Sequence, residues 1–130
     1  MKNFKLFLIT IISVLFLVSC SKDELEVPVY TSKGTYDSGV LVLNEGAFMS
    51  SNSSVSFISF DLNTVQNNIF SLANPSLVLG DVAQSIGFNG DLAYIVVNNS
   101  NKIRIVNRYT MANVAVITAG LNNPRYISFV

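Results

Sequence analysis

The chain has 130 residues, half of them hydrophobic, with eight basic and eight acidic side chains, no histidine and a single cysteine. Without histidine there is no Ser-His-Asp triad, no histidine-ligated zinc and no imidazole base, and one cysteine gives neither a disulfide framework nor a CxxC metal knuckle. The few carboxylates show no spacing that would pair them for hydrolysis. The composition therefore predicts a protein that is not an enzyme, with no metal site and no cofactor.

The first 19 residues are typical of a secretory signal peptide. Lys2 and Lys5 give a positively charged start, and residues 6–18 are almost wholly apolar. A membrane-spanning helix needs about 20 apolar residues. The shorter run therefore favours a signal that is removed on export over a permanent anchor.

The apolar run ends in Leu17-Val18-Ser19-Cys20, which resembles the bacterial lipobox of an apolar pair, a small residue and a cysteine. This resemblance implies cleavage before Cys20 and lipid attachment to its thiol, and several acyl chains together give stable membrane anchoring. The alternative is an ordinary signal peptide with an incidental cysteine.

Three charged residues follow the cysteine closely: Lys22, Asp23 and Glu24. They resemble the acidic export tag of surface lipoproteins in the Bacteroidetes, which implies display on the outer face of the outer membrane. The alternative is a solvated linker that happens to carry charges.

Residues 20–38 are polar and have no apolar period, so we expect a tether between the lipidated cysteine and a domain that begins at Gly39. From Cys20 onward the chain keeps six basic and eight acidic side chains, a net charge of −2. Because nucleic-acid binding needs a basic face, this balance argues against a nucleic-acid partner.

Residues 39–130 predict an all-β domain. Short apolar or alternating runs are separated by Asn, Asp, Gly and Ser, which favour turns, and no ten-residue stretch keeps a helical period. The expected strands are 40–43, 55–60, 65–72, 85–88, 93–97, 102–106, 114–117 and 126–130.

Three pairs of segments recur in the same order along this domain. They are VLVLN (40–44) with YIVVN (94–98), FDLNT (60–64) with VNRYT (106–110), and DVAQSIGF (81–88) with NNPRYISF (122–129). Propeller blades recur at about 40–45 residues, which matches the separation of the third pair. The repeat predicts about two four-stranded antiparallel blades, the first with an insertion at 45–54 where the second has only 99–102.

Residues 93–130 resemble the YVTN-type, YncE-like β-propeller repeat. The positions that fit the repeat are Tyr94, Asn98, Ile103, Ile105, Asn107, Thr110, Val114, Ile117, Gly120, Pro124 and Ile127. The sequence departs from the repeat at Asn107, where aspartate is usual, and by one extra residue before Pro124. The resemblance implies the N-terminal portion of a seven-bladed propeller. Because a ring needs 4–8 blades, we expect the 39–130 region to be part of a longer, truncated domain.

Three stretches taken together resemble the N-terminal part of Bacteroidetes surface lipoproteins of this class: VLNEG (42–46), LGDVAQSI (79–86) and AYIVVNNSNKI (93–103). Some of these lipoproteins capture cobalamin for a TonB-dependent outer-membrane transporter. The resemblance implies a surface-anchored ligand-binding module with partners of this kind. The alternatives are a scaffold propeller that binds only proteins, and a propeller lyase or hydrolase whose catalytic residues lie in the missing blades.

Propellers bind ligands through loops at one end, so the insertion and the matching turn supply the candidate ligand-binding residues: Asn44, Glu45, Phe48, Asn98 and Asn99. Carboxamides donate and accept hydrogen bonds, and a phenylalanine offers a stacking face. The alternative is that the asparagines only satisfy their turns, which tolerate left-handed backbone.

Overall fold

The structure is a computed structural model that describes residues 29–130. The predicted signal peptide, Cys20 and the export tag Lys22, Asp23 and Glu24 lie outside the described residues. The chain divides into two units, residues 1–30 and residues 31–130, and the features below belong to the second. No helix within the described range is long and apolar enough to cross a membrane.

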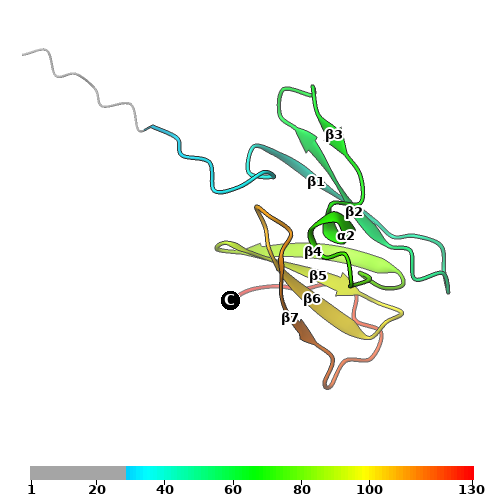
Figure 1. Cartoon of the computed structure of the whole chain (residues 1–130). Helices are drawn as coiled ribbons and strands as arrows, with labels where there is room; N and C mark the ends of the chain where they lie inside the picture. The colour runs from blue at the N-terminus through cyan, green and yellow to red at the C-terminus, as the bar shows by residue number, and fades with distance from the viewer. Residues whose placement is uncertain (1–28) are drawn as a thin grey trace, which may run out of the picture. The chain divides into compact units, whose positions relative to one another are not determined.

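Two antiparallel sheets make up this unit (Figure 1). The first sheet has the order β1-β2-β3, with strands β1 (Gly39–Asn44), β2 (Ser54–Ser59) and β3 (Val65–Gln66). The second has the order β4-β5-β6-β7, with β4 (Ala83–Asn89), β5 (Leu92–Val97), β6 (Lys102–Asn107) and β7 (Asn113–Ile117). The prediction of an all-β fold is confirmed, but the prediction of four strands in the first sheet is wrong, because that sheet has three.

Two turns that the sequence comparison paired have the same construction. In the β2–β3 turn, Asp61 Oδ1 accepts a hydrogen bond from the Asn63 backbone N–H at 3.1 Å. In the β6–β7 turn, Asn107 Oδ1 accepts one from the Tyr109 backbone N–H at 3.0 Å. A short polar side chain that bonds the backbone two residues on is the usual way to fix such a turn, so Asn107 replaces aspartate without loss of the turn.

The hydrophobic core lies between the two sheets. On β5, Ala93, Ile95 and Val97 are fully buried, since alternate residues of a strand point to the same face. Val55 and Phe57 of β2 belong to the same buried cluster, so the first sheet packs its inner face against one face of the second.

Residues 69–73 form a short helix, α2 (Ile69–Ala73), and the expectation of a strand over 65–72 is wrong beyond Gln66. A strand would send Ile69 and Phe70 to opposite faces, whereas the helical turn buries both, at 0% and 1% exposure. The helix packs against β2. The Asn74 carboxamide then closes the helix, because its Nδ2 donates to the carbonyls of Phe70 and Met111, each at 2.8 Å.

The opposite face of the second sheet is covered by residues 124–130, which we call the covering segment. Asn98 Nδ2 donates to the Pro124 carbonyl at 2.9 Å, and the Tyr94 and Phe129 rings meet edge to face at 5.0 Å. A Cβ on Gly87 would lie 2.7 Å from Ile127 Cγ2, so only glycine admits this close approach. In Figure 1 the segment is the red trace beside β4 and β5.

The expected strand at 126–130 is wrong, because the covering segment has no ladder partner in the structure and is not assigned as a strand. Its side chains contact the face of the second sheet, while its backbone does not pair with an edge of that sheet. The apolar residues at 126–130 therefore do pack on the second sheet, as their pattern indicates, but their backbone does not pair with a strand.

Candidate functional site

Three segments meet at one end of the two sheets, which we call the loop end. They are the insertion loop 45–53 between β1 and β2, residues 79–82 before β4, and the turn 98–101 between β5 and β6. The Ser53 backbone N–H donates to the Gly80 carbonyl at 3.1 Å. The predicted insertion is therefore a loop that folds back onto the start of the second sheet.

Asp81 joins the three segments and is only 5% exposed. Its Oδ2 accepts hydrogen bonds from the Met49 backbone N–H at 2.9 Å and from Asn99 Nδ2. Its own backbone N–H donates to Ser100 Oγ at 2.9 Å. The other carboxylate oxygen, Oδ1, is buried without a hydrogen-bond partner in the described part of the chain.

Hydrogen bonds keep this carboxylate charged. The Asn99 carboxamide contributes most to lowering the pKa of Asp81, burial opposes it, and the backbone N–H groups of Met49, Ser51 and Ser50 add to the lowering. Hydrogen bonds to a charged form favour that form. Asp81 is therefore a buried anion that attracts the backbone of the insertion loop.

The insertion loop also has internal bonds that fix its shape. Asn52 Oδ1 accepts a hydrogen bond from the Ala47 backbone N–H at 2.8 Å, and the Ser50 N–H donates to the Ala47 carbonyl at 3.1 Å. Met49 and Ser51 have left-handed backbone, with φ of 62° and 51°. Such residues cost energy and persist only where their surroundings hold them. Here the Asp81 carboxylate binds the Met49 backbone directly.

Phe48 lies at the tip of this loop and is 70% exposed, and the neighbouring Met49 is 79% exposed. Two large apolar side chains thus point to solvent from a loop whose backbone is anchored. Of the predicted ligand-binding residues, Phe48 has the placement that a stacking contact requires. The Glu45 side chain is also exposed, while its backbone carbonyl accepts from Ser53 Oγ.

The structure places the predicted asparagines differently from one another. Asn44 Nδ2 donates to Ser54 Oγ and Ser56 Oγ at 3.1 and 3.0 Å, and Asn98 Nδ2 donates to the covering segment. Both amide groups therefore satisfy neighbours on the outer faces of their sheets. Only Asn99 joins the loop end, through Asp81.

The sequence comparison aligned VLVLN (40–44) with YIVVN (94–98), and in the structure this alignment is off by one residue. Leu41 packs against the inter-sheet core, and so does Ile95 from the other side. The two therefore face each other instead of occupying equivalent places.

Sequence reasoning did not select Asp81, although it lies in the repeated segment DVAQSIGF. Its counterpart in the second copy is Asn122, so the repeat alone does not mark the position as special. The signal that was available is a carboxylate directly after Gly80, whose φ of 136° favours glycine. Its partners lie 32 and 18 residues away, which local spacing does not reveal.

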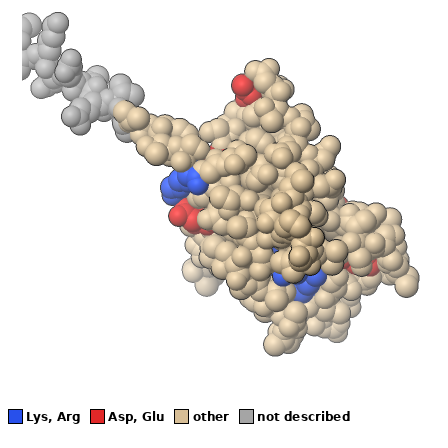
Figure 2. All heavy atoms as spheres, in the orientation of Figure 1, with Lys and Arg blue, Asp and Glu red and all other residues tan. Residues whose placement is uncertain are grey.

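Charge is sparse around the domain. Figure 2 shows only a few acidic and basic side chains on the face in view, one basic group beside an acidic one, and no basic patch. Within residues 29–130, no three His, Cys, Asp or Glu side chains gather as they would around a metal ion.

Comparison with known proteins gives a family. No curated protein matches the chain. The family model described as "Domain of unknown function (DUF5074)" matches residues 38–129, which include both sheets and nearly all of the covering segment, and the chain belongs to this family.

Proposed function

We propose that the chain is an outer-membrane lipoprotein, anchored through Cys20 and displayed at the cell surface by Lys22, Asp23 and Glu24, that captures a small ligand. The lipobox-like sequence and the charged flank support the anchor and its display. By resemblance, the ligand is of the cobalamin type and the partner is a TonB-dependent transporter.

We further propose that the domain is the N-terminal portion of a YVTN-type propeller. In a propeller each blade packs between two neighbours. The second sheet supports this proposal, because the first sheet covers one of its faces and the covering segment covers the other. The covering segment would then be the first strand of a following blade.

The observation that carries the binding function is the anchored insertion loop with Phe48 at its tip. A binding loop that is already ordered loses little conformational entropy when the ligand arrives. Asp81 supplies that order by holding the Met49 backbone. The large, flat ring of a cobalamin suits an exposed aromatic side chain such as that of Phe48.

The test compares radiolabelled cyanocobalamin retained by intact cells that produce the wild type or Phe48→Ala. We expect Phe48→Ala to retain about tenfold less, the effect of losing roughly 1.4 kcal/mol of binding. The matched control is Phe60→Ala, since Phe60 is 69% exposed in the β2–β3 turn at the other end of the first sheet. Equal retention by both variants and the wild type would contradict capture at the loop end.

The anchor is tested separately from the ligand. Cys20→Ala should leave unprocessed precursor that no longer partitions with the outer membrane, and replacing Lys22, Asp23 and Glu24 by alanine should protect the protein from protease added to intact cells. Normal processing of the first variant would refute lipidation. Unchanged protease access to the second would refute the export tag.

A further inference from the structure

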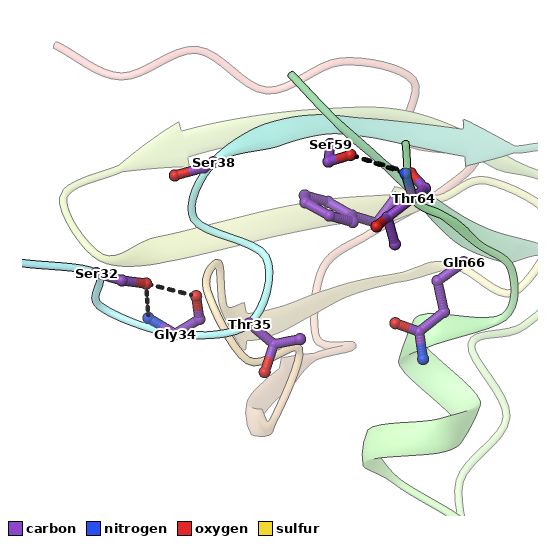
Figure 3. A pocket seen from close by; sticks show the side chains of 8 residues that line it. Ser32, Gly34, Thr35, Ser38, Ser59, Thr64 and Gln66 are labelled. Carbon is purple, nitrogen blue, oxygen red and sulfur yellow. Dashed lines mark hydrogen bonds between the residues drawn. The ribbon is translucent and has the colours of Figure 1, made fainter. Parts of the chain in front are cut away.

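A cavity lies away from the loop end, where residues 32–38 pass the far ends of β2 and β3 (Figure 3). Its volume is about 340 Å³. Ligand pockets usually enclose about 300–1,000 Å³, so this one has room for a molecule of monosaccharide size. None of the five residues predicted to bind ligand lines it.

The lining is rich in hydroxyl groups. Five of the lining residues carry one: Ser32, Thr35, Ser38, Ser59 and Thr64. The Gln66 carboxamide also faces the cavity in Figure 3. Each hydroxyl both donates and accepts, and a carboxamide does both at once, so the wall can match a ligand that itself carries several hydroxyls.

Two of these polar side chains are fixed by hydrogen bonds within the chain, and two others can still form hydrogen bonds with a ligand. Ser59 Oγ accepts from the Thr64 backbone N–H at 3.0 Å, and Ser32 Oγ donates to the Gly34 carbonyl at 3.0 Å. The side chains of Gln66 and Thr35 have no hydrogen-bond partner among residues 29–130, and Gln66 is half-buried. The polar atoms of Gln66 are not buried away from solvent, so they are free to form hydrogen bonds with a ligand in the cavity.

The remaining wall is apolar and uncharged. Phe57, 5% exposed, forms part of the lining, and the threonine methyl groups add apolar surface beside it. No acidic or basic residue lines the cavity. Lys33, next to Ser32 in the chain, pairs with Asp91 at 2.9 Å, so the nearest basic group in sequence is already engaged and an anionic ligand gains nothing from it.

We propose that this cavity binds a neutral polyhydroxylated molecule of monosaccharide size, with Gln66 and Thr35 as its principal hydrogen-bonding residues. The apolar groups of Phe57 and the threonines contact the carbon-bound hydrogens of the ligand. The site lies away from the insertion loop and is independent of the capture proposed there.

The experiment is a titration of the mature, full-length chain with glucose, galactose, mannose and N-acetylglucosamine, followed by the amide NMR signals of residues 32–38 and 57–66. At least one of these sugars should shift those signals in a saturable way. Gln66→Leu, which keeps the side-chain size and removes its polar atoms, should weaken binding by about tenfold. Thr35→Val, on the exposed segment before β1, should weaken it as well and guards against a folding defect in the first variant.

Val65→Thr is the matched control. Val65 neighbours Gln66 in β3, is 63% exposed and does not line the cavity, so its replacement should leave the sugar affinity unchanged. The proposal is overturned if none of the four sugars shifts the cavity signals up to its solubility limit. It is also overturned if the shifts persist unchanged in both Gln66→Leu and Thr35→Val.

Discussion

The two sheets use similar strands and differ in how many of their faces are covered. On β5 of the second sheet, Val96 points away from the inter-sheet core and is nevertheless fully buried, because the covering segment lies on that side. On β1 of the first sheet, Val42 also points away from the core and is 36% exposed, and Val40 beside it is 52% exposed. A valine in a strand is thus a core residue only where another layer covers it.

This difference shows why apolar content alone does not reveal packing in such a domain. Both faces of β5 in the second sheet carry the apolar side chains expected of a strand buried on two sides. The outer face of the first sheet also carries two valines, Val40 and Val42, but these are exposed. An exposed apolar sheet face of this kind is a place where another layer could pack.

The largest expected loss of unfolding free energy follows from truncating a residue of the inter-sheet core. Ile95→Ala removes a side chain with no exposed surface, and truncations of this kind cost about 2–5 kcal/mol of unfolding free energy. Ile58→Ala is the matched change on the outer face of the first sheet, where Ile58 is half-buried, and should cost about 1 kcal/mol. Urea denaturation measures both, and equal losses would contradict the one-sided burial of the first sheet.

A smaller difference in unfolding free energy is expected between truncation of Val96 and truncation of Val42, the two valines that point away from the core. Val96→Ala deletes two buried methyl groups at about 0.8 kcal/mol each, or about 2 kcal/mol with the cavity left behind. Val42→Ala removes groups that already meet water and should change the unfolding free energy by about 0.5 kcal/mol. If Val96→Ala proves as mild as Val42→Ala, the covering segment does not pack on the second sheet in solution.

Much of the fold was predictable because strand periodicity is a local signal. The runs at 40–43, 93–97 and 102–106 became strands with nearly the expected bounds. Ile69 and Phe70 were misassigned, since adjacent apolar residues suit a buried strand as well as a short helix. What decided the outcome was non-local: the core accepts both side chains, and Asn74 ties the helix to Met111.

The candidate site was predictable only in its location. The insertion after Asn44 and the turn at Asn98 meet at the loop end, and loops at strand ends are visible in the sequence. The central residue, Asp81, was not predictable, since its bonds to Met49 and Asn99 form only when both sheets are assembled. The spacing of these residues along the sequence does not indicate such contacts.

The third prediction concerns the bond that fastens the covering segment. Asn98→Ala removes the donor to the Pro124 carbonyl, and one hydrogen bond is worth about 1 kcal/mol. Hydrogen exchange across residues 124–130 should become faster. Asn44→Ala is the control on the uncovered sheet, because it frees only the Ser54 and Ser56 hydroxyls, and exchange in the covering segment should not change. Faster exchange in both variants would mean that the segment is not held specifically by Asn98.

The smallest change in global stability is expected at Asp81, because opening the insertion loop does not require the core to unfold. Asp81→Asn removes the charge that attracts the Met49 N–H while keeping the side-chain shape, so protease should cut within 45–53 faster than in the wild type.

Because the pKa of Asp81 is lowered in the folded state, its stabilising contribution is fully present above the ordinary aspartate pKa of about 3.9 and is lost as pH falls through the lowered value. Exchange of the Met49 amide should therefore differ between variant and wild type at neutral pH and converge in acid. Asp61→Asn, in the turn at the other end of the first sheet, is the control, since it should leave the insertion loop unaffected at every pH. A difference at the Met49 amide that does not diminish in acid would show that the charge on Asp81 is not what holds the loop.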